Sequence, residues 1–473
     1  MTTRRTLPIA MLVLAAGCAS QDGLQKHSAP VDPRQLGTAR TLAAAPVNPD
    51  AWPSEAWWRA LGDTQLDGLI EEALVASPSI RLARARVNRA VALAEAAGAP
   101  RAPQINFDFN TTRQRLTENG IYPPQLGGHW INQNLVQLNF TYDFDFWGRN
   151  DAALQAALGQ ARAADADAHG AALVLSSAIA LAYVQLARAH DQIDLAKELL
   201  LQRERQYALV RERLAAGLDS RVELKQAEGA PHEARQRIAQ LEETAALSRN
   251  QIAALLGQGP DRGQAIERPR PEPAAMLALP SALPADLLGR RPDIVASRWR
   301  VEAAARDADA ARADFYPNIN LLLFAGFQAI TFTHFLESGS RALGIGPAVH
   351  LPIFDGGRLR GNLGAKYADF DAAAEQYNQA LADALREVAD QVAAWRSIEG
   401  QEAEVGAALA AAQAAYDLSL ARYRAGLTNY LTVLTTESQL TSQRVLAAEL
   451  RARRLESAIG LARALGGGYG GRS

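Results

Sequence analysis

Apolar and polar residues alternate along one stretch of the chain with the period of a β-strand. Between Val136 and Phe146 the even positions are apolar or aromatic and the odd positions are polar. Ile105, Phe107 and Phe109 repeat this pattern in a preceding segment. Strict alternation predicts strands with one apolar face, and about ten tilted residues are enough to cross the hydrocarbon of a bilayer. The pattern predicts either a membrane-spanning strand pair or a soluble hairpin packed on a core.

A second pair of alternating segments follows later in the chain. The first runs from Ile319 to Phe327 and the second from Leu343 to Ile353, with apolar residues also on the inner face in places. A polar loop that contains Gly and Pro joins the first pair, at residues 119–128. Such residues are typical of turns between strands. The sequence therefore predicts four strands in two hairpins.

Two other stretches have the composition of long helices. No proline occurs from Asn150 to Ala216 or from Leu359 to Ala425, and alanine is abundant in both. Each could extend about 100 Å at 1.5 Å per residue, and small residues let helix axes approach closely. Each is expected to stop at a Gly-Leu turn and reverse into a second helix that ends near Gly257 or Gly466. Pro231 interrupts one returning helix and is expected to kink it.

The chain contains the same pattern twice. The Gly217-Leu218 pair and the Gly426-Leu427 pair are 209 positions apart, and an arginine before and a glutamate after each pair keep the same separation. The separation is larger by five upstream of Asn110, so the first copy carries the longer loop. A repeat of this length predicts two copies of one structural unit joined in tandem.

The amino terminus has the features of a targeting signal rather than of a folded segment. Arg4 and Arg5 precede an apolar stretch that ends in small residues directly before Cys18, as in a secretory signal peptide. The run Leu14-Ala15-Ala16-Gly17-Cys18 resembles the lipobox of bacterial lipoproteins, although Leu lies one place early. The resemblance implies that Cys18 carries a covalent lipid, and Ala19-Ser20 resembles the sorting signal for the outer membrane. The alternative is an ordinary signal peptide with an incidental thiol.

These patterns predict the organisation of the whole chain. The expected segments are a signal peptide (1–17), a lipidated N-terminal tether (18–60), a first repeat (61–257), a proline-rich connector (258–282), a second repeat (283–467) and a glycine-rich tail (468–473).

Composition and charge exclude several functions. The chain has 49 Lys and Arg against 51 Asp and Glu, and no basic block interleaved with aromatic residues, so we expect no nucleic-acid partner. Its single cysteine excludes disulfides and cysteine-based metal clusters. The seven histidines are scattered, with no His-x-x-x-His pair. We therefore expect no enzyme, no metal and no cofactor other than the lipid.

Four strands create a physical problem in a membrane. They cannot close into a barrel, and each unpaired N–H or C=O group at an open edge costs several kcal/mol in hydrocarbon. Copies of the chain must therefore combine into a barrel of eight, twelve or sixteen strands, and three copies give twelve. The polar positions of the clearest strand are then expected to face a water-filled lumen: Asn139, Thr141, Asp143 and Asp145.

Several motifs resemble one protein family, the outer-membrane factor lipoproteins of the NodT and OprM type, which are relatives of TolC. The motifs, in order, are Trp57-Trp58, Gly289-Arg290-Arg291-Pro292-Asp293-Ile294, Phe315-Tyr316-Pro317, Leu351-Pro352-Ile353-Phe354-Asp355-Gly356-Gly357-Arg358 and Arg422-Tyr423-Arg424-Ala425-Gly426. The resemblance implies a mixed α and β membrane protein with two tandem repeats, a trimeric twelve-stranded outer-membrane β-barrel and a long periplasmic α-helical barrel. It also implies a passive exit duct for small molecules expelled by an inner-membrane pump through a periplasmic membrane-fusion adaptor.

The same resemblance implies roles for residues at the two Gly-Leu turns. The periplasmic tips, where the adaptor docks, correspond to Gly217, Leu218, Gly426 and Leu427. Relatives often carry aspartates that form an acidic ring at the entrance, whereas this chain has Thr432 and Thr435 there. The candidates for lining the aperture are Asp219, Glu223, Tyr423, Thr432 and Thr435. An alternative function is a structural periplasmic coiled-coil lipoprotein that braces the envelope and whose hairpins never insert.

Overall fold

The computed structural model describes residues 21–42, 52–121, 123–272, 287 and 289–470. The predicted signal peptide, Cys18, part of the proline-rich connector and the end of the glycine-rich tail lie outside the described residues. The chain divides into two compact units, and each unit contains segments from both predicted repeats. Within the described chain, the first unit comprises 21–30, 86–164 and 296–378, and the second comprises the remaining residues.

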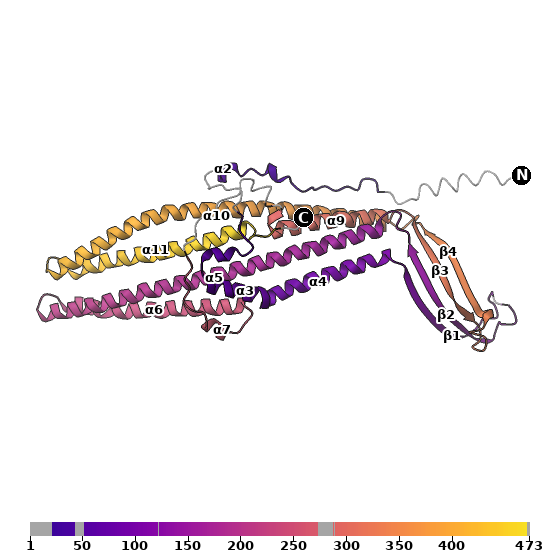
Figure 1. Ribbon diagram of the computed structural model, residues 1–473, viewed down its shortest axis with the longest axis horizontal. Helices are drawn as coiled ribbons and strands as arrows, with labels where there is room; N and C mark the ends of the chain where they lie inside the picture. The colour runs from indigo at the N-terminus through magenta and orange to yellow at the C-terminus, as the bar shows by residue number, and fades with distance from the viewer. Residues whose placement is uncertain (1–20, 43–51, 122, 273–286, 288, 471–473) are drawn as a thin grey trace. The chain divides into compact units, whose positions relative to one another are not determined.

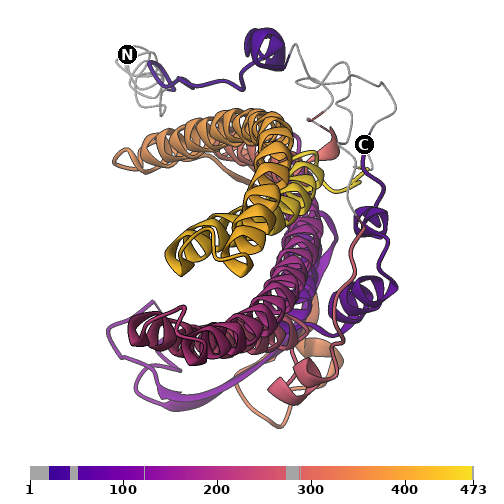
Figure 2. The same cartoon turned by 90° about the vertical axis from the view of Figure 1, so that its left-hand side faces the viewer.

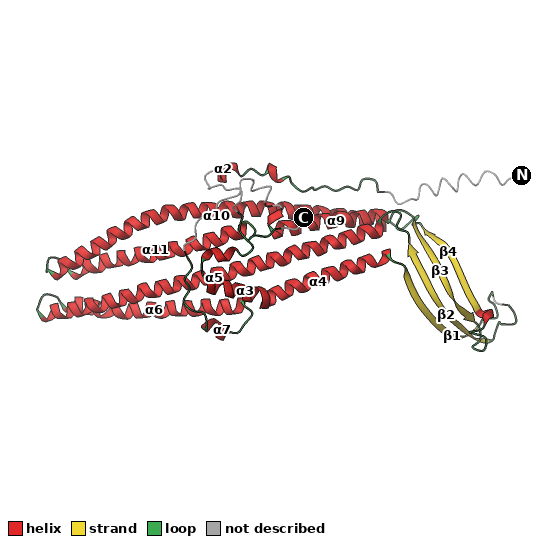
Figure 3. Ribbon diagram, viewed as in Figure 1, coloured by secondary structure: helices red, strands yellow, loops and turns green. Residues whose placement is uncertain are grey.

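The first unit contains one four-stranded antiparallel sheet (Figure 3). Its strands are β1 (Gln104–Arg115), β2 (Trp130–Asp143), β3 (Asn318–Ala329) and β4 (Arg341–His350), paired in that order. Short 3₁₀ helices lie at Ala99–Arg101 and Ser338–Ser340. The strands of the first repeat therefore pair directly with those of the second, so the sheet is built jointly by the two copies.

Two strands are shorter than their hydrophobic pattern predicts. The alternation after β2 continues through Phe144 and Phe146, but the ladder ends at Asp143. Asp145 has a positive φ of 45°, and its carboxylate accepts hydrogen bonds from the backbone N–H groups of Asn150 and Asp151. The prediction that Asp145 is a strand residue is therefore wrong, because this side chain caps the following helix. Likewise, β4 ends at His350, before the predicted limit at Ile353.

The two long helices have the predicted extent. Helix α5 covers Arg149–Ala215 and α10 covers Arg358–Arg424, with 67 residues each. Their antiparallel partners are α6 (Arg221–Leu255) and α11 (Tyr430–Ala464), with 35 residues each (Figure 1). Helix α6 continues through Pro231 without interruption. Equal lengths in the two repeats follow from the proline-free stretches and from the glycine at each turn.

The remaining helices are shorter. They are η1 (Pro33–Gln35), α2 (Ala39–Leu42), η2 (Trp57–Leu61), α3 (Thr64–Ala76), α4 (Pro78–Gly98), α7 (Pro260–Gln264) and α9 (Pro292–Ala313). In the second unit, the Tyr183 hydroxyl of α5 donates to the Asp63 carboxylate at the start of α3 (2.7 Å). The same carboxylate accepts from the backbone N–H of Arg270 (2.8 Å), which ties the segment after α7 to α3.

The largest apolar core lies in the second unit, where the middle of α5 meets α3, α6 and α11. Ile179, Tyr183 and Leu186 of α5 are fully buried there. Helix α5 contains an 18-residue window that is apolar enough to span a membrane by length and composition (mean hydropathy 1.8), and 56% of that window is buried inside the fold. Its apolar character therefore matches a core helix.

Candidate functional site: the strand face and the hairpin tips

A row of apolar residues crosses all four strands on one face of the sheet. The strand registers pair Ile105 of β1 with Phe140 of β2, Phe140 with Leu323 of β3, and Leu323 with Ile345 of β4. In the isolated chain these rows are open to solvent at both edges, with Ile105 67% exposed and Ile345 72% exposed. Such a continuous apolar face is what a lipid-facing barrel wall requires.

The opposite face of the first hairpin is polar. Asn139 and Thr141 of β2 lie on this face with Asp143, one position out of step with the apolar row. The Asn139 amide donates to the Asp108 carboxylate of β1 and accepts from the Gln137 amide (2.7 Å). Three of the four predicted lumen-facing residues are thus brought onto one face, and Asp145 lies beyond the strand.

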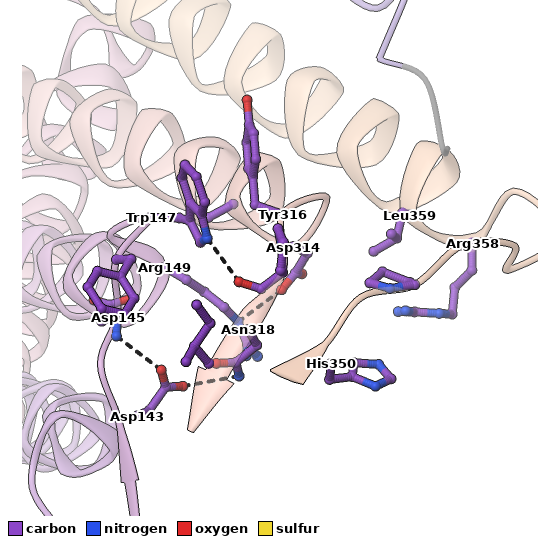
Figure 4. Close-up of a pocket in the computed structure, with 15 residues that line it drawn as sticks. Asp143, Asp145, Trp147, Arg149, Asp314, Tyr316, Asn318, His350, Arg358 and Leu359 are labelled. Carbon is purple, nitrogen blue, oxygen red and sulfur yellow. Dashed lines mark hydrogen bonds and ion pairs between the residues drawn. The ribbon is translucent and has the colours of Figure 1, made fainter. Parts of the chain in front are cut away.

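A small cavity of about 250 Å³ lies where the sheet meets the helices of the first unit (Figure 4). Its ionised groups are largely paired within the chain: Arg149 forms an ion pair with Asp314 (2.9 Å), and Asp143 accepts from the Asn318 amide (3.2 Å). Trp147 stacks on Tyr316 with ring centroids 4.6 Å apart. These contacts fix the direction in which the helices leave the sheet.

The turns that join α5 to α6 and α10 to α11 lie at the end of the molecule that faces the viewer in Figure 2. Gly217 has a φ of 74° and Gly426 a φ of 73°, the left-handed conformation that lets a helix end and reverse. The leucines that follow project outward, with Leu218 65% exposed and Leu427 68% exposed. At each tip, the predicted glycine thus forms the turn and the predicted leucine forms an exposed apolar contact surface.

Below the tips, the two hairpins bind each other through a charged cluster. Arg213 forms an ion pair with Asp219 (3.0 Å) and also donates to the backbone carbonyl of Tyr423 (3.0 Å). The Tyr423 hydroxyl donates to the same Asp219 carboxylate. Hydrogen bonding to Asp219 raises the pKa of Arg213, and burial raises the pKa of the Tyr423 hydroxyl. The arginine therefore stays charged and the phenol stays neutral across physiological pH.

This cluster fixes the positions of two of the candidate aperture residues. The Asp219 side chain is only 7% exposed and Tyr423 is 1% exposed, so both are directed into the hairpin contact in this conformation. Glu223 completes a capping box at the start of α6, where its carboxylate accepts from the backbone N–H of Ser220 (2.9 Å). That bonding with Ser220 lowers the pKa of Glu223. Arg213, which holds this cluster together, was not among the predicted residues.

The two threonines at the second tip are exposed. Thr435 donates to the backbone carbonyl of Leu431 (2.9 Å), and Thr432 donates to the side chain of Asn429 (2.9 Å). Asn429 in turn caps α11 by accepting from the backbone N–H of Thr432. Both hydroxyls are thus held by local hydrogen bonds, and this tip carries no formal charge at the two positions.

A segment before the first short helix lies along α10 in the first unit. The Asp22 carbonyl accepts from Arg360 (2.8 Å), and the Asp371 carboxylate accepts from the backbone N–H groups of His27 and Ser28 (2.9 Å each). Leu24 packs with an apolar cluster of α9 and α10. We call residues 22–29 the strap. The sequence predicted a tether here but gave no sign that it would adhere to a helix.

Among the residues that the structure describes, no group of three or more His, Cys, Asp or Glu side chains could hold a metal ion. The described chain presents an apolar sheet face, long helices and two apolar tips.

Comparison with known proteins assigns the chain to a family. The family model for outer membrane efflux protein matches residues 69–258 and 283–467, which together make up most of the chain. The chain belongs to the outer membrane efflux protein family. The two matched segments correspond to the two repeats seen in the sequence.

Individual relatives agree with this assignment. The fusaric acid resistance protein FusA of Burkholderia cepacia is 42% identical over 374 residues, which cover 77% of this chain and 70% of that protein. The pyoverdine export outer membrane protein OpmQ of Pseudomonas aeruginosa is 31% identical and covers 97% of both chains. The crystal structure of the outer membrane protein VceC from Vibrio cholerae superimposes with a TM-score of 0.84 at 37% identity, covering 89% of this chain and all of that one.

These findings confirm the main predictions from sequence. The protein is an outer-membrane efflux channel of the TolC-like fold, with tandem repeats, a helical part and an antiparallel β part. The family is one of channel proteins rather than of enzymes.

Proposed function

We propose that three copies of this chain form one channel, with a twelve-stranded barrel in the outer membrane and a helical tube in the periplasm. The observation that carries this proposal is the open sheet. Of the described strands, β1 and β4 each pair on one side only, yet their apolar residues continue the lipid-facing rows. Joining β4 of one copy to β1 of the next satisfies both edges. The number three comes from the resemblance to the family.

The strap supports a lipid anchor on Cys18. It holds Asp22 beside Arg360, close to the start of α10 at Arg358, which follows the sheet. Four residues of extended chain reach at most about 14 Å. A lipid anchor four residues before Asp22 is therefore compatible with insertion into the inner leaflet of the outer membrane beside this unit. A Cys18→Ser variant is expected to lose the lipid mass in mass spectrometry of the purified protein.

The tips are proposed as the entrance. Leu218 and Leu427 present two equivalent apolar points per chain, which fit the hairpin tips of a periplasmic membrane-fusion adaptor that connects the channel to an inner-membrane pump. Gly217 and Gly426 provide the turns that bring both leucines to the ends of their hairpins. The channel itself is passive, and small molecules enter it with energy supplied by the pump.

Strand-edge cross-linking in outer membranes tests the oligomer. One cysteine replaces Asn106 in β1, and a second is scanned over residues 344–348 of β4. We expect oxidation to produce covalent trimers in denaturing gels. A matched pair on neighbouring strands of one chain, Thr141→Cys with Leu322→Cys, should cross-link without changing the subunit mass. A stable single subunit in detergent, together with no pores in planar bilayers, would contradict the proposal and favour the structural lipoprotein.

Ion selectivity tests the proposed aperture. Replacing Thr432 and Thr435 by aspartate adds two charges per subunit at exposed positions of the second tip. If these positions face the lumen, we expect the reversal potential in a salt gradient to shift towards cation selectivity. An unchanged reversal potential would place them away from the pore and leave Asp219, Glu223 and Tyr423 as the remaining candidates.

A further inference from the structure

One carboxylate is buried between helices where the channel function does not require it. The Glu437 side chain of α11 is only 1% exposed and faces α5 in the second unit. Its Oε1 accepts hydrogen bonds from the amides of Gln202 (2.9 Å) and Gln206 (3.0 Å). Its Oε2 has no hydrogen-bond partner in the described chain. Burying an ionised oxygen without a donor is costly unless the group becomes neutral.

The cation that faces this group is shared with another acid. Arg203 of α5 approaches Oε2 of Glu437 to 3.7 Å through Nε, too far for a hydrogen bond. Its Nη1 instead donates to Glu233 (3.2 Å) and to the Ala230 carbonyl (3.3 Å), both on α6. The positive charge is therefore divided between a solvent-exposed carboxylate and the buried one.

Two neutral phenols bond the same Gln206 amide that holds Glu437. Tyr416 of α10 accepts a hydrogen bond from the Gln206 amide (3.2 Å), and the Tyr430 hydroxyl of α11 donates to the oxygen of the same amide (3.4 Å). Burial raises the pKa of Tyr430 to about 12 and also raises that of Tyr416. Neither phenol changes charge between pH 4 and pH 8, so these two groups add no charge of their own around Glu437 in that range.

Burial dominates the ionisation of Glu437. It raises the pKa of this carboxyl above its ordinary value, while the attraction of Arg203 and the two amide donors lower it by less. When α11 separates from α5, water reaches the carboxylate and its pKa returns towards the ordinary value near 4.3. The packed arrangement consequently binds the proton more tightly than the separated one.

The first repeat shows that the hairpin does not need this arrangement. Glu228 of α6 occupies the equivalent position, 209 residues earlier, and its side chain is 43% exposed. It pairs with Lys225 one turn away (2.7 Å). The same residue type is thus a solvated surface group in one copy and an enclosed group in the other.

We propose that Glu437 is a protonation-controlled clasp: when protonated it keeps α11 packed against α5, and when ionised it loosens this contact. The packed state is the one with the raised pKa, so the clasp is fully stable below the ordinary pKa of a glutamate. Its stability is lost as the pH rises through the raised value. Acid therefore holds the two helices together, and neutral to alkaline conditions favour their separation. The consequence for flow through the entrance rests on the proposed channel function.

Hydrogen exchange of the full-length protein tests the clasp directly. We compare amide exchange in α11, residues 430–445, between wild type and Glu437→Gln at each pH, because the intrinsic pH dependence of exchange then cancels. The glutamine mimics the protonated acid. The ratio of wild-type to variant rates is expected to be near one at pH 4.5 and to rise severalfold by pH 8, because the ionised carboxylate disfavours the packed state.

The control is Glu228→Gln, at the exposed equivalent position, whose rates should follow wild type at every pH. A second variant, Glu437→Met, removes the charge with a similar volume and should also exchange independently of the clasp. A wild-type to Glu437→Gln ratio that stays flat from pH 4.5 to pH 8 would overturn the proposal.

Single-channel recording on the same preparations separates the two proposals. If the exchange ratio rises but the protein forms no pores, the clasp stands and the channel assembly fails. If pores form with normal conductance while the ratio remains flat, the channel stands and the clasp fails. If both hold, we expect the pH dependence of channel opening to disappear in Glu437→Gln and to persist in Glu228→Gln.

Discussion

The two hairpin tips share a backbone but not a chemistry. Their turns have nearly identical φ values at Gly217 and Gly426, and their helices have equal lengths. The first tip uses a Ser220–Glu223 capping box, whereas the second uses Asn429. Tyr423 of the second hairpin reaches across to Asp219 of the first. The two repeats therefore share a backbone conformation at their hairpins. Their side chains differ and bind each other rather than playing the same role in each copy.

This difference also holds further from the tips. Arg291 at the start of the second repeat is buried and donates to Asp293 (2.6 Å), Glu387 (2.9 Å) and the Ala464 carbonyl (2.9 Å). The matching position of the first repeat is Ser77, which is also buried. The second repeat is thus anchored to its last helix, α11, by a buried charge, whereas Ser77 of the first repeat caps the end of α3.

The largest effect is expected at Arg291. An Arg291→Ala substitution leaves the Glu387 carboxylate and a helix-terminal carbonyl without their donor, which should lower the free energy of unfolding by about 3 kcal/mol. Ser77→Ala should cost about 1 kcal/mol or less. Thermal unfolding of the detergent-solubilised protein, followed by circular dichroism, measures both. Equal losses would mean that the two repeats are anchored in the same way.

The next largest effect concerns the bond between the hairpins. Tyr423→Phe removes a hydrogen bond to an ionised acceptor and should cost about 2 kcal/mol. Tyr430→Phe removes only the long contact to Gln206 (3.4 Å) and should cost about 0.5 kcal/mol. Hydrogen exchange at residues 213–219 reports the loosening of the first tip. A larger change from Tyr430→Phe would contradict the assigned role of Asp219.

The two glycine turns should respond alike. An added Cβ meets no atom within 4 Å at Gly217 or Gly426. An alanine is therefore strained only by the left-handed backbone, which should lower the free energy of unfolding by about 1 kcal/mol at each site. Denaturant titrations of the two single variants provide the measurement. Losses in the free energy of unfolding that differ by more than about 1 kcal/mol would show that the two turns do not have equivalent backbones.

The smallest effect is expected at the helix caps. Ser220→Ala and Asn429→Ala each remove a side chain that accepts a backbone N–H at the start of an exposed helix, which should cost about 0.5 kcal/mol. The matched variant Glu223→Gln keeps the shape of the capping box and should cost less. Protease cleavage rates within the first turns of α6 and α11 measure this fraying. Faster cleavage in only one of the two variants would show that the two caps do not stabilise their helices equally.

The sequence alone predicted the long helices and the turns between them. The 67-residue helices follow from the absence of proline, and the turns follow from the repeated glycine. The strand limit was predicted too far because aromatic alternation continues beyond the ladder. Phe144 packs edge-on against Tyr142 and stacks on Phe146, so these rings contact each other where the ladder ends. The last backbone contact with β3 is the hydrogen bond from the Phe144 N–H to the Ile319 carbonyl (3.3 Å).

The chemistry between the hairpins was harder to predict. Arg213 and Tyr423 are 210 residues apart, and neither carries a motif that reveals the other as its partner. Glu437 sits in a run of polar residues that reads as a solvated helix face, and only the packing of α11 on α5 encloses it. Alanine-rich helices give weak periodicity, so their buried polar contacts depend on tertiary register that the pattern does not encode.

The equal helix lengths have a consequence for how such a protein can evolve. A segment inserted into α5 alone would push the first turn past the second, and in the proposed trimer only three of the six turns would then lie at the same height. Lengthening must therefore occur in α5 and α10 together, with matching insertions in α6 and α11. Each insertion must comprise whole helical turns, so that the same face of each helix stays packed against its neighbour. Size variation among such ducts should come in paired steps.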